Sequence, residues 1–244
     1  AIPFRLILRE PPRGRFDPPA PLAPPFREVL RLLRTKPAFW LLALGAAASS
    51  MMGYGLIFWM PSYFQRSLGL SLIETTWFYG TLGLIGGVAG IWLGGVLGDR
   101  LGARNRAAYA RVPALAFTLT APFYVLGLSL TWLPGVFLVL IVPSALALVW
   151  LGPVIAAVQG MAPPAMRATA SAIFLLINNL IGIGGGTLFL GRLSDLLAEQ
   201  YGADSLKWAI LAGLPLYLMA AGFMLLAARR LERDWPVTLT PAAA

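Results

Sequence analysis

Six long apolar runs, separated by short stretches rich in charged, proline or glycine residues, make up most of this 244-residue chain. A helix needs roughly 20 mostly apolar residues to cross a hydrocarbon layer about 30 Å thick, and each run is long enough. The breaks are expected near residues 66–71, 99–106, 129–131, 160–164 and 192–207. The pattern predicts an all-α membrane protein with six transmembrane helices, approximately Ala38–Phe64, Leu72–Gly98, Val112–Leu130, Leu133–Gln159, Ala168–Leu190 and Trp208–Ala228.

Basic residues are concentrated at one set of helix ends, which predicts the orientation of the bundle. Arginine and lysine are enriched on the cytoplasmic side of membrane proteins. Only Arg66, Arg192 and Lys207 lie at the opposite ends. Both termini are therefore expected in the cytoplasm of a multi-pass protein of the cell (inner or plasma) membrane. The twelve basic residues on the predicted cytoplasmic side are Arg27, Arg31, Arg34, Lys36, Arg100, Arg104, Arg106, Arg111, Arg167, Arg229, Arg230 and Arg233.

Three parts are expected along the chain: a cytoplasmic connector over 1–37, the six-helix bundle over 38–228 and a cytoplasmic tail over 229–244. The connector is rich in proline and is predicted to be extended and polyproline-like. Within it, Phe26–Arg34 has the pattern of a short amphipathic helix, either on the inner leaflet or simply leading into the first span. Because the chain opens at Ala1 without a leader pattern, we expect a fragment or a processed product.

Composition agrees with lipid as the main solvent and excludes most enzyme chemistry. Only 12% of the residues are charged, against about 25% in soluble proteins, and mean hydropathy is +0.75. The chain contains no cysteine and no histidine, so thiol, imidazole and Cys- or His-ligated metal sites are excluded. The net charge of +9 lies around the apolar runs rather than on one polar face, so no nucleic-acid partner is expected. We expect neither an enzyme nor a cofactor.

A short motif recurs in the two halves of the predicted bundle. The second apolar run ends in Gly95-Val96-Leu97-Gly98-Asp99 and the fifth in Gly191-Arg192-Leu193-Ser194-Asp195, both of the form G-x-L-x-D. Because three helices separate the two positions, equivalent units insert in opposite orientations. The sequence predicts two inverted three-helix repeats, with Asp99 at the cytoplasmic end and Asp195 at the outer end, an arrangement typical of secondary transporters.

The segment from Gly95 to Arg104, Gly-Val-Leu-Gly-Asp-Arg-Leu-Gly-Ala-Arg, resembles the G-x-L-x-D-R-x-G-R-R loop of the major facilitator superfamily. Ala103 departs from the first position of the usual arginine pair. The resemblance implies half of a twelve-helix fold, namely the carboxy-terminal six helices, with an amino-terminal half as partner. It also implies that Gly95, Asp99, Arg100, Gly102 and Arg104 form a conformational latch.

Three further stretches are similar to the spinster-like subgroup of that superfamily. They are residues 10–14, the fifth helix from Asn178 to Asp195, and residues 202–209. The resemblance implies an amphiphilic or lipid-like solute, such as a lysolipid. A carrier of organic anions or drugs in the same superfamily, with Arg167 as an anion contact, and a non-transporting membrane scaffold are the alternatives.

Polar and aromatic side chains inside the apolar runs are the candidates for substrate contacts. Asn178 and Asn179 lie near the middle of the fifth run, where a polar group needs a partner. In the first run Ser50, Tyr54 and Phe58 recur every four residues and are expected to form one stripe, and Trp150 is a weaker candidate. Met51 and Met52 are candidate pocket residues. No acidic residue lies at mid-membrane in the six runs, so a proton-coupling acid would belong to the other half.

Glycines at 86, 90, 94 and 98, and again at 182 and 184–186, are expected to serve close helix packing. For the second group we also consider a hinge.

Overall fold

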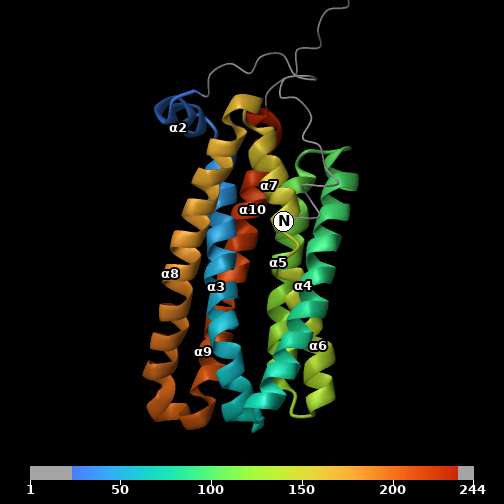
Figure 1. Ribbon diagram of the computed structural model, residues 1–244, viewed down its shortest axis with the longest axis vertical. Coiled ribbons are helices and arrows are strands. Elements are labelled where there is room, and N and C mark those ends of the chain that lie inside the picture. Colours follow the sequence, from blue (N-terminus) through green and yellow to red (C-terminus); the bar gives the residue numbers. More distant parts are fainter. Residues whose placement is uncertain (1–23, 236–244) are drawn as a thin grey trace, which may run out of the picture.

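The computed structural model describes residues 24–235, and in that range the chain forms helices and connecting turns without strands. The helices run along a common axis, with both ends of the described chain at the same end of the bundle (Figure 1). Five helical stretches are long and apolar enough to cross a membrane. The last of these, Pro164–Asp234, turns back on itself at Gly202, where φ is +53°. It therefore contributes two antiparallel arms, and the predicted six crossings are confirmed.

The first two spanning helices are α3 (Pro37–Leu68) and α4 (Leu72–Gly102). Gly69 ends α3 in a left-handed conformation with φ +69°, which glycine adopts without steric penalty. Ser71 then begins α4 with a capping box, because its hydroxyl accepts from the Glu74 amide while the Glu74 carboxylate accepts from the Ser71 amide. Three residues therefore suffice to reverse the chain.

The third span is α5 (Ala108–Ser129), and the fourth is divided into α6 (Leu133–Leu146) and α7 (Leu151–Gly160). Pro153 lies in the first turn of α7 and has no amide hydrogen, so it leaves the carbonyl of Val149 without its usual helical partner. Over residues 147–150 the fourth span continues as turns, in which Leu148 and Val149 donate to carbonyls three residues earlier instead of four. This stretch is the α6–α7 break.

The fifth span is α8 (Arg167–Tyr201), which follows a short 3-10 turn, η1 (Pro164–Met166). After a second short turn, η2 (Gly202–Asp204), the sixth span consists of α9 (Ser205–Gly213) and α10 (Pro215–Asp234). Pro215 breaks the last span because it cannot donate a backbone hydrogen bond.

The helices were predicted to end too early wherever a charged residue was taken as the boundary. Arg66 lies within α3, Asp99 within α4, and Arg192 and Asp195 within α8. Charged side chains mark where a helix leaves the hydrocarbon layer, whereas the helix itself continues until a residue such as Gly69 or Gly202 allows the backbone to turn.

The helix packing has the symmetry that two inverted repeats require. In the first unit α3 packs against α8 of the second, and the equivalent contact joins α6 and α7 to α4. Likewise α3 packs against α10 as α6 packs against α5, while α5 and α10 contact each other. The inverted repeat predicted from the G-x-L-x-D motif is therefore confirmed.

Glycines make both equivalent contacts unusually close. A Cβ at Gly90 or Gly94 would collide with the carbonyl oxygens of Ala145 and Val149 at the α6–α7 break. In the other repeat, a Cβ at Gly186 would collide with the Met51 carbonyl of α3, and one at Gly182 would lie 2.8 Å from Ser50 Cβ. These positions serve packing, as expected. By contrast, Gly184 faces open space.

Helix α2 (Phe26–Arg34) precedes the first span. Its Val29 and Leu33 are buried against the bundle, where it contacts α3 and α8, and Trp40 Nε1 donates to the Leu33 carbonyl at 3.0 Å. The polyproline-like connector lies mostly outside the described residues. Pro25, which is described, has φ −61° and ψ 148°, as polyproline does.

The end of the last helix caps the start of the first spanning helix. Asp234 is 6% exposed, and its Oδ2 accepts from the amide of Ala38 at 2.7 Å, while Lys36 Nζ donates to the Asp234 carbonyl. A carboxylate at a helix N-terminus satisfies a free amide and interacts well with the helix dipole. Trp235 follows and stacks on Tyr109, with the two ring centroids 5.8 Å apart. The Arg106 guanidinium lies over the Trp235 ring, 4.7 Å from its centroid.

The close crossing of α8 over α3 predicts that alanine substitutions at Gly186 and Gly184 have different effects on the stability of the protein. We expect Gly186→Ala to destabilise the protein by roughly 1–3 kcal/mol, because the added methyl meets backbone rather than a flexible side chain. Gly184→Ala is the matched control and should unfold at or above the wild-type temperature. Thermal unfolding in detergent measures both, and equal effects would show that Gly186 does not set the crossing.

Candidate substrate cavity

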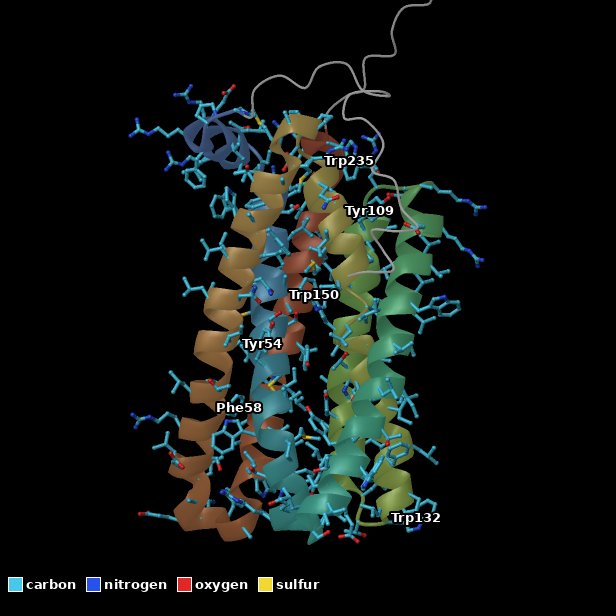
Figure 2. All side chains as sticks on the ribbon, viewed as in Figure 1. Tyr54, Phe58, Tyr109, Trp132, Trp150 and Trp235 are labelled. Atoms are coloured by element: carbon cyan, nitrogen blue, oxygen red, sulfur yellow. The ribbon has the colours of Figure 1, made fainter. Side chains whose placement is uncertain are left out.

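A cavity of about 580 Å³ opens at the middle of the bundle, between the elements of the two repeats. In Figure 2, Tyr54 and Trp150 lie at mid-height of the bundle, and Phe58 lies nearer the end that carries Trp132. Most of the wall is apolar. The lining residues are Ser49, Ser50, Gly53, Tyr54, Leu56, Ile57, Met60, Tyr79, Leu82, Gly83, Gly87, Tyr124, Ser144, Ala147, Leu148, Trp150, Leu151, Leu175, Asn178, Asn179 and Tyr217.

Four polar side chains of α3 and α8 pair with one another on one wall. Ser50 Oγ donates to Asn178 Oδ1 at 2.8 Å, and the Tyr54 hydroxyl donates to Asn179 Oδ1 at 3.2 Å. Asn178 is only 4% exposed, whereas Asn179 and Tyr54 are half-buried and lie beside the cavity. Gly182 makes this pairing possible, because it lets α8 approach Ser50 and Tyr54 closely.

The two asparagines differ in exposure: Asn178 is buried between helices, whereas Asn179 is partly exposed beside the cavity. Adjacent residues on a helix point about 100° apart, so Asn178 faces α3 and Asn179 is the more accessible of the pair. The Asn179 amide nitrogen has no hydrogen-bond acceptor among residues 24–235. This amide is therefore available to a solute in the cavity.

Trp150 is part of the wall at the α6–α7 break. It is 5% exposed and packs on Phe174 of α8 with ring centroids 6.3 Å apart. The Trp150 ring therefore contacts α8 and also lines the cavity.

Phe58 does not line the cavity with Ser50 and Tyr54. Its side chain is 68% exposed. Four residues turn a helix by about 400°, so a spacing of four drifts by about 40° per step and the third member leaves the face of the first. Met51 and Met52 do not line the cavity either, and Met60 does.

The residues of the predicted latch lie at the end of α4 that adjoins α5. Asp99, Arg100 and Arg104 are exposed. Gly102 is the last residue of α4 and does not have a positive φ. Instead, a Cβ there would meet the ring of Tyr109, with Cε1 at 2.6 Å. Gly95 lies against Gly152, whose Cβ would be 3.5 Å from Gly95 Cα.

Sequence reasoning missed three tyrosines of the cavity wall, Tyr79, Tyr124 and Tyr217. They come from α4, α5 and α10, and each looks like an ordinary packing residue within its own apolar run. It also missed Asp234, an acid in a basic segment that caps a helix 196 residues away. The sequence does not show that Asp234 is buried, so it gave no sign of this contact.

The cavity wall carries no charged side chain in the part of the chain that the structure describes. No cluster of three acidic side chains that could hold a metal ion occurs within residues 24–235. Arg167, the possible anion contact, instead donates from Nε to the carbonyl of Ala162 at 3.2 Å, where it holds the α7–α8 connection. The cavity can therefore recognise a solute by hydrogen bonds and apolar contact.

The family profile described as "Major Facilitator Superfamily" matches residues 1–186. The chain belongs to this superfamily. Its motif at Asp99, its inverted repeats and its glycine-mediated crossings all lie in a six-helix bundle that matches half of the superfamily fold.

Curated relatives place it near two named groups within the superfamily. It is 34% identical over 204 residues to an "MFS-type efflux pump" of Mycolicibacterium smegmatis, which covers 83% of this chain and 47% of that protein. It is 28% identical over 217 residues to "Protein spinster homolog 1" of Homo sapiens, covering 80% of this chain and 40% of that protein. The Xenopus tropicalis protein of the same name is 25% identical over 252 residues, with 93% and 48% covered. The chain spans about half the length of these relatives.

A solved structure agrees with the spinster-like resemblance. The bacterial homologue of the human lysosomal transporter Spinster, in an inward-facing and unoccupied conformation, superposes with a TM-score of 0.81 at 27% identity. The match covers 99% of this chain and 58% of that one. The same homologue in an inward-facing and occupied conformation gives a TM-score of 0.75 at 26% identity, covering 99% and 56%.

The Ser50–Asn178 hydrogen bond predicts different effects for two adjacent serines. We expect Ser50→Ala to lower stability by about 0.6 kcal/mol and at most about 1.7, the range for such bonds between membrane helices. Ser49→Ala should cost less, because the Ser49 hydroxyl bonds to Ala46 of its own helix. Unfolding in a mixed-micelle titration measures both. A larger loss for Ser49→Ala would contradict the assigned pairing.

Proposed function

We propose that this chain is one half of a secondary active transporter that moves an organic solute by alternating access. The observation that carries the proposal is the cavity between two inverted repeats, at mid-height in a membrane bundle. Transporters of inverted-repeat architecture bind their substrates near the bilayer midplane and rock one bundle against the other. A missing amino-terminal six-helix half is the proposed partner that closes the cavity.

The proposed solute is amphiphilic and lipid-like. Support comes from the chemistry of the wall: the amide of Asn179, the hydroxyl of Tyr54 and the ring of Trp150 adjoin leucines, Ile57 and Met60. Such a surface suits a molecule with a small hydrogen-bonding group and a long apolar part. The similarity to spinster proteins supports the same class. Phe58, exposed and further toward the outer end, would contact the other half or the apolar part of the solute.

Export of drug-like amphipathic compounds is the second candidate function. The 34% identity to an "MFS-type efflux pump" favours it. The cavity suits both classes, whereas an organic anion is less well supported because Arg167 is engaged at the α7–α8 connection. A scaffold subunit without transport would show no substrate-dependent flux.

We place both termini in the cytoplasm of a cell that carries the protein in its plasma or inner membrane. The Ala38–Asp234 hydrogen bond brings the start and end of the bundle to the same end. The excess of arginine and lysine there supports the cytoplasmic side. Any coupling acid is proposed to lie in the other half, because the described cavity wall carries none.

Flux into proteoliposomes tests this function. The whole protein that carries this chain should take up a fluorescent monoacyl phospholipid and leave a hydrophilic sugar acid outside. Asn179→Ala should lower that flux roughly 3- to 10-fold, as loss of one hydrogen bond to the solute would. Gln200→Ala, which likewise removes a side-chain amide but at the exposed end of α8, should leave it unchanged. Uptake of the sugar acid alone would overturn the amphiphile proposal, and no flux at all would favour the scaffold.

We further propose that Asp99 and Arg100, with Gly95, Gly102 and Arg104, act as a conformational latch. Asp99 lies three residues from the C-terminal end of α4, where a negative charge is unfavourable for the helix dipole. The charge therefore does not stabilise its own helix, which suggests a partner on another element in one state of the cycle.

Asp99→Asn tests the latch through access to the cavity. In a background free of other cysteines, a cysteine at Leu175 in the cavity wall should react with a water-soluble maleimide. We expect Asp99→Asn to change its reaction rate about 2- to 10-fold, since a coupling of about 0.5–1.4 kcal/mol shifts the conformational populations by that factor. Glu232→Gln removes an exposed charge at the same end and should have no effect. An unchanged rate in Asp99→Asn would contradict the latch.

A further inference from the structure

Tyr217 of α10 contributes a buried hydroxyl to the cavity wall, which also holds the asparagine pair of α8. Tyr217 has an exposed fraction of 0% and lines the cavity from α10. Its hydroxyl oxygen has no hydrogen-bond partner among residues 24–235. A buried tyrosine hydroxyl usually has a hydrogen-bond partner, because without one the free-energy cost of removing it from water is not compensated.

Three other hydroxyl-bearing side chains, from α4, α5 and α6, line the same cavity as Tyr217 and add polar groups to its mostly apolar wall. The Tyr124 ring of α5 stacks on Tyr217, with centroids 6.2 Å apart and an interplanar angle of 10°. The Ser144 hydroxyl of α6 and the Tyr79 phenol of α4 belong to residues that line the same cavity. Ser144 itself donates to the Leu140 carbonyl at 2.7 Å, so its oxygen remains an acceptor.

This hydroxyl cluster, defined as Tyr79, Tyr124, Ser144 and Tyr217, comes from α4, α5, α6 and α10. The amide and hydroxyl groups of α3 and α8 form the other polar region of the same cavity, and the remaining wall, including Leu56, Leu82 and Leu148, is apolar. The cavity wall thus carries polar groups on two sets of helices, α3 with α8 and α4 to α6 with α10.

We propose that the hydroxyl cluster is a second polar subsite, in which Tyr217 donates a hydrogen bond to an uncharged oxygen of the solute, such as an ester carbonyl. This deepens the proposed function and rests on it. An uncharged acceptor fits because the cavity wall described here offers no cation to balance an anion, and burying an unpaired charge is far more costly than burying a carbonyl. A phenol supplies the single donor that a carbonyl needs. Selectivity follows, because an analogue without the carbonyl leaves Tyr217 unsatisfied.

The test combines one missing oxygen in the solute with one missing oxygen in the protein. The probes are two radiolabelled lysophospholipids of equal chain length, one with an ester-linked acyl chain and one with an ether-linked alkyl chain. Binding to the whole purified protein is measured by scintillation proximity for wild type and for Tyr217→Phe. We expect wild type to prefer the ester about 5- to 10-fold, the value of one well-placed hydrogen bond. Tyr217→Phe should abolish that preference by weakening the ester alone.

Tyr63→Phe is the matched control, because it removes the hydroxyl of a buried tyrosine that does not line the cavity. It should keep the preference for the ester. Equal weakening of both probes by Tyr217→Phe would show a packing role, and no change with either probe would show that Tyr217 serves only water or the core; both results overturn the proposal. If wild type binds neither lysophospholipid, the proposed amphiphile function fails, which is a different result from a wild type that binds both equally.

Discussion

The close passage of α8 over α3, and of α4 over the α6–α7 break, is the contact on which the rest of the structure depends. Inside a bilayer, helices gain little from burying apolar surface, so association relies on close packing and on hydrogen bonds between helices. Glycines at 182 and 186 on one side and at 90 and 94 on the other bring backbones together, and a methyl group at these places would meet a carbonyl or a Cβ atom. The cavity lies between these two tight contacts.

The short distance between α3 and α8 also determines which of their polar side chains can form hydrogen bonds with each other. Ser50 reaches Asn178, and Tyr54 reaches Asn179, only because Gly182 leaves no side chain between the helices. Two asparagines in hydrocarbon are costly unless they find partners. Their pairing thus makes a polar wall compatible with the membrane and leaves one amide toward the cavity. The same small residue therefore determines both the helix packing and the polar part of the cavity wall.

The helices and their inverted order were predictable from the sequence because twenty apolar residues and a repeated G-x-L-x-D leave few other arrangements. The ends of α3, α4 and α8 were not, since charged residues mark the membrane surface rather than the turn. The cavity wall was predictable only in part. Whether Phe58 or Met60 faces inward depends on how α3 is rotated against its neighbours, and single tyrosines in three separate runs give no sign that they converge.

The hydrogen bond between the Ala38 amide and the Asp234 carboxylate joins two residues that are synthesised far apart in time. The first turn of α3 leaves the ribosome 196 residues before the carboxylate that completes it. At about 5–20 residues per second, that delay is roughly 10–40 s. During this interval α3 lacks the carboxylate that caps its first turn, because Asp234 belongs to α10, the last helix of the bundle to be made. The contact that joins the start of α3 to the end of α10 can therefore form only after all the other described helices have been synthesised.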